Sequence, residues 1–174
     1  LLGRGNTEPA DKAASTAIYS SLLAGAAVVL FSVIFLRPIL HRLGASETVM
    51  PYALTYTRIY VTFSIFNVFN VTMNNIVSSE GAAKTTMCVL MTGAVLNVIL
   101  APLFIYRLNL GVAGAAAATA VSQCVSSLMY LGYILSKKSL FRFRIRDYCL
   151  SKEILSEILK IGIPTLAFQL LTSL

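Results

Sequence analysis

Charge is scarce in this sequence. Only 12% of the 174 residues are charged, whereas 57% are hydrophobic, and the mean hydropathy is +0.78. In a soluble globular domain roughly a quarter of the residues would be charged. The composition therefore excludes an ordinary soluble domain and favours a protein built into a lipid bilayer.

Residues that ligate metals or form disulfides are also few. The three cysteines, Cys88, Cys124 and Cys149, form no CxxC pair, and the single histidine, His41, lies near none of them. This pattern predicts neither a metal site nor a disulfide framework, and we expect no cofactor. An intramembrane enzyme would need a paired His and Asp, a Ser and Lys, or a metal cluster at membrane depth. None is present in the uncharged runs, so we do not expect an enzyme.

Long runs without any charged residue are what the sequence has instead. They cover residues 13–36, 59–79, 85–106 and 108–136. A helix needs about 20 residues to cross the hydrocarbon core, and each run is long enough. The sequence therefore predicts an all-α polytopic membrane protein with four complete spans.

The basic residues indicate how these spans are oriented. The net charge is +7, and half of the Lys and Arg residues lie in segment 137–160, between apolar runs. The positive-inside rule places that segment and residues 1–12 in the cytoplasm, so nucleic-acid binding is not expected. Residues 150–159 alternate charged and aliphatic side chains at helical spacing, which predicts an amphipathic helix on the membrane within segment 137–160.

Two stripes of polar side chains run along the apolar segments. One stripe contains Asn67, Asn70, Asn74 and Ser78, with Ser64 one turn earlier, and the other contains Thr119, Gln123, Ser126 and Tyr130. Both follow helical spacing, so each occupies one face of a helix. Such a face is costly in lipid. It predicts either hydrogen bonds between helices or the lining of a wet cavity, and the sequence leaves both open.

A set of motifs around residue 100 resembles a known family. Asn97 precedes Ala101-Pro102-Leu103-Phe104-Ile105, and Leu110-Gly111-Val112-Ala113-Gly114-Ala115-Ala116 leads to Ala118-Thr119 and Ser122-Gln123. The order and spacing are similar to the fifth and sixth helices of the multidrug and toxic compound extrusion (MATE) family. The segment Pro51-x-Ala-x-x-Tyr-x-Arg-Ile resembles the junction of its third and fourth helices.

The resemblance implies a domain organisation. MATE proteins are twelve-helix bundles with two related lobes. Residues 1–136 would be part of the first lobe, 137–160 the basic cytoplasmic loop, and 161–174 the start of the second lobe. The chain begins with Leu-Leu-Gly rather than Met and ends within an apolar run, so we expect it to be a fragment.

The resemblance also implies where a site would lie. In the family an Asn, an Asp before the Pro, and a Thr on the next helix contribute to a cation-linked site, and Asn97 and Thr119 match the first and last of these. Ala101 stands where the family has the Asp, so the group that could bind a proton is missing. Coupling and simple packing remain open for both residues. The candidate cation- or substrate-binding residues are Asn97, Thr119, Asn67, Asn70, Asn74 and Gln123.

The function implied is secondary transport. A MATE-like antiporter would export cationic or amphipathic organic compounds (drugs) in exchange for Na⁺ or H⁺, as a monomer in the cytoplasmic membrane of a bacterium. A flippase for lipid-linked saccharides from the same superfamily is one alternative. The other is a membrane scaffold that transports nothing.

Overall fold

The computed structural model describes residues 7–136, with side chains from residue 14. The elements are α1 (Thr7–Ile34), α2 (Leu36–Arg42), α3 (Met50–Ser79), α4 (Ala83–Pro102), the π-helical turn η2 (Leu103–Arg107) and α5 (Gly111–Leu135). Residues 7–136 contain no strand, which confirms the all-α prediction. The amphipathic helix expected within 137–160 and the second-lobe start at 161–174 lie outside the described residues.

Each of the four uncharged runs corresponds to one long helix, α1, α3, α4 or α5, but not every boundary agrees. The run 59–79 lies inside α3, which begins at Met50, because Arg58 interrupts the uncharged run without interrupting the helix. Pro51 occupies the first turn of α3, where its missing N–H has no helical partner to lose. Arg37 and Pro38, which directly follow the first uncharged run, lie in the first turn of α2.

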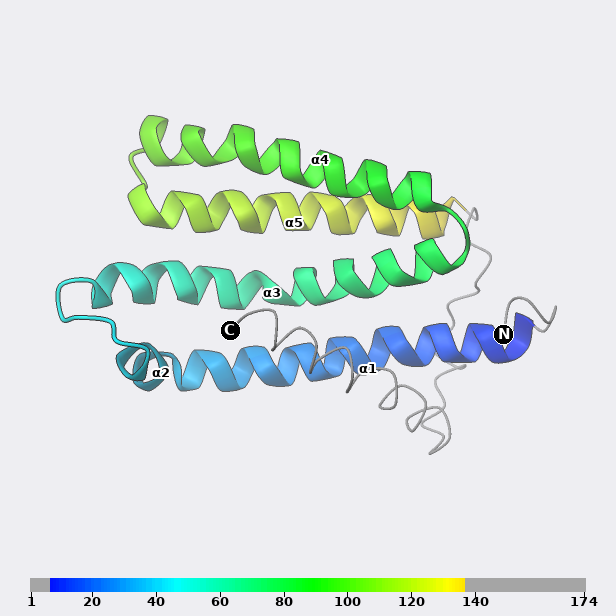
Figure 1. Cartoon of the computed structure of the whole chain (residues 1–174), viewed down its shortest axis with the longest axis horizontal. Coiled ribbons are helices and arrows are strands. Elements are labelled where there is room, and N and C mark those ends of the chain that lie inside the picture. The colour runs from blue at the N-terminus through cyan, green and yellow to red at the C-terminus, as the bar shows by residue number, and fades with distance from the viewer. Residues whose placement is uncertain (1–6, 137–174) are drawn as a thin grey trace. The chain divides into compact units, whose positions relative to one another are not determined.

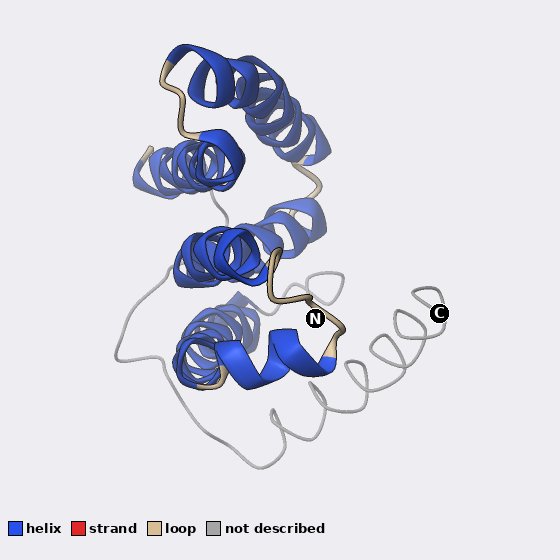
Figure 2. Cartoon of the chain, turned by 90° about the vertical axis from the view of Figure 1, so that its left-hand side faces the viewer, coloured by secondary structure: helices blue, strands red, loops and turns tan. Residues whose placement is uncertain are grey.

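α5 is the central helix of its group. It lies between α3 and α4, as Figure 1 shows, and it contacts both along their length. Among the described residues, those from Ser20 to Ser136 belong to one compact unit, whereas the first turns of α1, up to Tyr19, belong to another. Later in α1, Ser21 meets Thr72 of α3 in a 3.0 Å hydrogen bond between hydroxyl groups. α2 runs across the end of α1 (Figure 2).

Small side chains allow α5 to be close to two neighbours at once. Ala116, Ala118 and Ala120 are buried, and Gly114 passes so near η2 that a Cβ atom there would lie 2.8 Å from the carbonyl carbon of Phe104. In lipid, close packing rather than hydrophobicity drives helix association. The alanine-rich start of α5 therefore forms the interior of the bundle, although it contains few large apolar residues.

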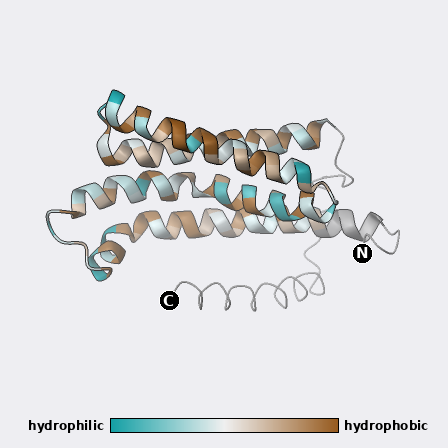
Figure 3. Ribbon diagram, turned by 45° about the horizontal axis from the view of Figure 1, so that its top comes forward, coloured by the Kyte–Doolittle hydropathy of each residue, from teal (hydrophilic) through white to brown (hydrophobic). Residues whose placement is uncertain are grey.

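Large apolar side chains point outward. Those most exposed on α4 include Met87, Leu90, Met91, Val95, Val98 and Ile99, and Figure 3 shows strongly hydrophobic stretches along this helix. Within residues 7–136, three helical segments are long and apolar enough to cross a membrane: Ala14–Ile34, Ala83–Arg107 and Gly111–Leu135. This is the pattern of a multi-pass membrane protein.

α3 is not among these three segments, although its 30 residues exceed the length required. Its asparagines and Arg58 lower its hydropathy. A polar helix face is tolerated in a bilayer where other helices cover it, and α5 covers α3 in this way. That α3 forms the fourth span stays a prediction.

Candidate functional site

The polar stripe of α3 is joined to α5 through Asn70. Its Nδ2 donates to the Gln123 side-chain oxygen at 2.7 Å and to the Gln123 backbone oxygen at 3.0 Å. Ser127 completes the group, because its Oγ donates to Asn70 Oδ1 at 2.9 Å and to the Gln123 carbonyl at 3.0 Å. Both ends of the Asn70 amide are therefore satisfied by α5.

A second link lies one turn further along the same two helices. Asn74 Nδ2 donates to the phenolic oxygen of Tyr130 at 3.2 Å, and the Tyr130 side chain is almost completely buried. The two links join α3 and α5 through polar groups. Helix-to-helix bonding is thus one role of the first stripe.

The candidate residues on α4 and α5 also meet. Asn97 Nδ2 donates to Thr119 Oγ1 at 3.0 Å, and the Thr119 hydroxyl donates to the Ala115 carbonyl at 3.1 Å. Thr119 therefore connects Asn97 to the backbone of α5. The Asn97 side-chain oxygen is left available to a ligand.

A cleft opens beside these groups. Its volume is about 240 Å³, and it receives side chains from α3, α4 and α5. We call it the α4–α5 cleft. Its lining residues are Asn70, Val89, Leu90, Gly93, Ala94, Asn97, Thr119, Ser122, Gln123, Ser126 and Tyr130.

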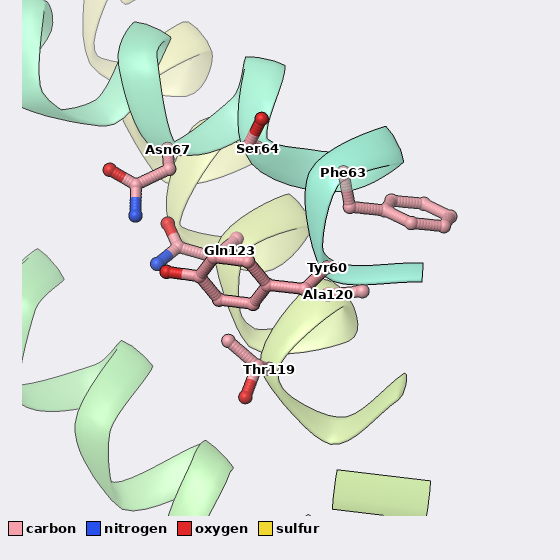
Figure 4. A pocket seen from close by; sticks show the side chains of 7 residues that line it. All are labelled: Tyr60, Phe63, Ser64, Asn67, Thr119, Ala120 and Gln123. Carbon is pink, nitrogen blue, oxygen red and sulfur yellow. The ribbon is translucent and has the colours of Figure 1, made fainter. Parts of the chain in front are cut away.

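A smaller hollow lies between α3 and α5, with a volume of about 10 Å³, which is space for about one water molecule. Figure 4 shows Tyr60 and Asn67 turned toward Gln123, whereas Phe63 points away. Thr119 and Gln123 line this hollow and the α4–α5 cleft alike. These two residues therefore occupy the position where both spaces meet.

Of the six candidates, four line the α4–α5 cleft, namely Asn70, Asn97, Thr119 and Gln123. Asn67 lines the smaller hollow. Asn74 lines neither space and reaches the cleft only through Tyr130. Both roles that the sequence left open for the polar stripes thus occur, bonding between helices and lining of a cavity. What these residues bind stays a prediction.

The chemistry of the cleft is polar but uncharged. Its lining offers amide and hydroxyl groups and no charged side chain. Within residues 14–136, no group of three His, Cys, Asp or Glu residues could hold a metal ion. Ser122 adds a buried hydroxyl oxygen that has no hydrogen-bond partner among residues 14–136. The cleft can solvate a ligand through neutral oxygens, but it cannot itself neutralise a charge.

Some residues of the site were not singled out from the sequence. Ser127 lies directly after Ser126 of the predicted stripe, Ser122 lies beside Gln123, and Tyr60 belongs to α3 one turn before Ser64. A search for every polar residue three or four positions from Gln123 would have found Ser127. Tyr60 gave no such signal, because its contact with α5 depends on the packing of two helices.

Comparisons with known proteins agree on one relationship. Residues 1–103 match the sequence profile of the MatE family. The chain is 30% identical over 171 residues to the multidrug export protein MepA of Staphylococcus saprophyticus subsp. saprophyticus, an alignment that covers 98% of this chain and 38% of MepA.

Solved structures extend this likeness to the fold. An inward-facing multidrug resistance MATE family transporter of the MOP superfamily matches with a TM-score of 0.87 and 33% identity, over 94% of this chain and 37% of that one. An outward-facing one matches with a TM-score of 0.90 and 32% identity, over 97% and 38% respectively. The chain thus spans about 38% of the length of the relatives it matches.

Proposed function

Since this chain belongs to the MatE family, we propose that it forms part of a secondary transporter that exports organic compounds in exchange for Na⁺ or H⁺. The proposed substrates are cationic or amphipathic, in keeping with the multidrug export protein to which the chain is similar. The proposed location is the cytoplasmic membrane of a bacterium, with residues 1–12 and 137–160 on the cytoplasmic side.

The observation that carries this proposal is the α4–α5 cleft. Asn97, Thr119 and Gln123 bring polar groups into a space between helices whose outer faces are apolar. Polar groups at membrane depth are costly unless they meet one another, water or a ligand. Tyr130 belongs to the same lining, but its side chain is buried among the helices, so an organic cation would meet the neutral amide and hydroxyl oxygens of the cleft.

Binding of the coupling ion needs a carboxylate that the cleft does not supply. Between residues 14 and 136 the only acidic residues are Glu47 and Glu80, and both lie in links between helices. Ala101, one helical turn after Asn97, cannot take up a proton. We therefore propose that the coupling carboxylate comes from another part of the full-length protein or from the substrate.

The experiment uses the full-length protein in proteoliposomes. Transport of a fluorescent organic cation would be followed under an imposed Na⁺ gradient and then under a pH gradient, for the wild type and Ala101→Asp. We expect one gradient to drive transport in the wild type. Transport by Ala101→Asp alone would contradict our assignment of the coupling carboxylate. Absence of transport in both proteins would contradict the proposed substrate class.

The flippase alternative fits the cleft less well. A lipid-linked saccharide carries phosphate groups, which proteins bind with Arg and Lys side chains, and none lines the α4–α5 cleft. A scaffold without transport would not need a polar lining between its helices. The neutral polar cleft therefore favours export of organic compounds over both.

A further inference from the structure

A separate hollow lies where α1 ends and α3 begins, away from the α4–α5 cleft. Its volume is about 360 Å³. Arg37 of α2 and Arg58 of α3 line it, together with Val33, Ile34, Leu54 and Thr55. It shares no residue with the cleft, so the transport proposal gives it no role.

The two arginines have no partner in the part of the chain that the structure describes. Neither guanidinium group makes an ion pair or a hydrogen bond there, and no acidic side chain is among the lining residues. The Thr55 hydroxyl is already occupied, since it donates to the Pro51 carbonyl at 2.9 Å. Two guanidinium groups around one hollow repel each other unless an anion lies between them.

The position of the hollow matches the surface of a bilayer. The first candidate span ends at Ile34, so Val33 and Ile34 lie at the edge of the hydrocarbon core. Arg37 follows directly, at the level where lipid headgroups begin. The side chain of Ile34 is 70% exposed, which leaves an apolar wall beside the two charges.

We propose that this hollow binds an anionic phospholipid. Arg37 and Arg58 pair with its phosphate oxygens, which the planar guanidinium fork suits. Val33, Ile34 and Leu54 contact the first carbons of its acyl chains. A free phosphate ion would leave this apolar wall unused, and for that reason the lipid is the occupant.

Native mass spectrometry of the full-length protein tests the proposal. The delipidated protein in detergent would be titrated with dioleoylphosphatidylglycerol and, separately, with dioleoylphosphatidylcholine. The test variant is Arg37→Gln/Arg58→Gln. The matched control is Arg107→Gln, because Arg107 is also an exposed arginine at a helix end but lines no part of this hollow.

We expect the double variant to bind phosphatidylglycerol about tenfold more weakly or worse, since hydrogen bonds to a charged group are lost. Arg107→Gln should bind as the wild type does, and phosphatidylcholine should bind the wild type more weakly. Equal affinities of wild type and double variant for phosphatidylglycerol would overturn the proposal, as would an equal loss in Arg107→Gln. Displacement of the lipid by millimolar inorganic phosphate would overturn the choice of a lipid.

A further variant keeps the proposal testable if the double variant does not fold. Arg58→Lys keeps the charge but lacks the guanidinium fork, so its affinity should fall between those of wild type and double variant. If circular dichroism shows that the double variant is unfolded, wild-type affinity in both Arg58→Lys and Arg37→Gln would overturn the proposal.

Discussion

Gln123 connects more of the site than any other candidate residue described here. Its side-chain and backbone oxygens both accept from Asn70, and it lines both the α4–α5 cleft and the hollow beside Tyr60. Its loss would therefore affect the α3–α5 contact and the polarity of the cleft together. Ser127 could keep part of the contact, since its hydroxyl also reaches Asn70.

We predict that Gln123→Leu lowers transport by about tenfold, because a hydrogen bond between membrane helices is worth about 1–2 kcal/mol and a factor of ten corresponds to about 1.4 kcal/mol. The measurement is gradient-driven transport of the fluorescent cation at equal protein density in proteoliposomes. The cleft also loses its central amide in this variant.

The control for Gln123→Leu is Asn109→Gly. Asn109 lies in the short link between η2 and α5 with φ 52°, a conformation that glycine adopts without strain. The Asn109→Gly variant should transport as the wild type does. Equal losses in the two variants would contradict the role of Gln123 in the cleft.

The candidate site residues were predicted from helical periodicity and from the resemblance to the family. Helical spacing placed Asn70 and Asn74 on one face, and the structure turns that face toward α5. The Asn97–Thr119 pair followed from the resemblance alone. Periodicity does not show which helix each stripe faces. Only the packed structure shows that Asn74 lines neither space, whereas the other candidates line the cleft or the smaller hollow.

At the scale of the helix, α5 depends on small residues. Gly114 is the closest case, because a Cβ atom there would lie 2.8 Å from the carbonyl carbon of Phe104 and 2.9 Å from its oxygen. These are backbone atoms and cannot turn aside. Gly132 on the same helix has nothing within 4 Å of a corresponding Cβ atom.

We predict opposite effects of the same substitution at these two positions. Gly114→Ala should lower the free energy of unfolding by about 1–3 kcal/mol, as overpacking does. Gly132→Ala should raise it by up to about 1 kcal/mol through helix propensity. Unfolding in mixed detergent micelles, followed by circular dichroism, measures both, and equal changes would contradict the close contact of α5 with η2.

The connection between α4 and α5 contains a π-helical turn that the uncharged runs do not indicate. Pro102 cannot donate a backbone hydrogen bond, and the helix widens directly after it into η2, where the Leu108 N–H donates to the Leu103 carbonyl at 3.2 Å. Such π turns are rare and often occur at functional sites. No composition signal separates a π turn from an α turn, so this feature was not predictable.

The helices themselves were predictable because lipid imposes a simple rule. Long uncharged runs must be helical to satisfy their backbone groups, and α4 with η2 and α5 follow their runs closely, whereas α1 begins six residues before its run. α3 departs from this rule because it begins at Met50, before Arg58. The uncharged run begins only after Arg58, so charge alone placed residues 50–58 outside the span. Charge locates the bilayer, whereas proline and backbone hydrogen bonding locate the helix ends.

At the scale of the whole molecule, the chain corresponds to about 37–38% of the MATE transporter structures that it matches. The chain matches inward-facing and outward-facing relatives with similar TM-scores, 0.87 and 0.90. The part of each relative that this chain matches therefore has a similar arrangement of helices. That the chain belongs to the first lobe stays a prediction, together with the proposed orientation.

The most direct test asks whether the α4–α5 cleft is open to water in the full-length protein. Ala94 lines the cleft, whereas its neighbour Val95 does not and is 55% exposed on the apolar face of α4.

In a background with the native cysteines replaced by alanine, Ala94→Cys and Val95→Cys would be treated with a charged methanethiosulfonate reagent. This chemistry requires a thiolate, which forms in water and not in lipid. Our account predicts rapid labelling of Ala94→Cys, slowed by a transported cation, and little labelling of Val95→Cys. Equal rates, or no protection by the cation, would contradict it.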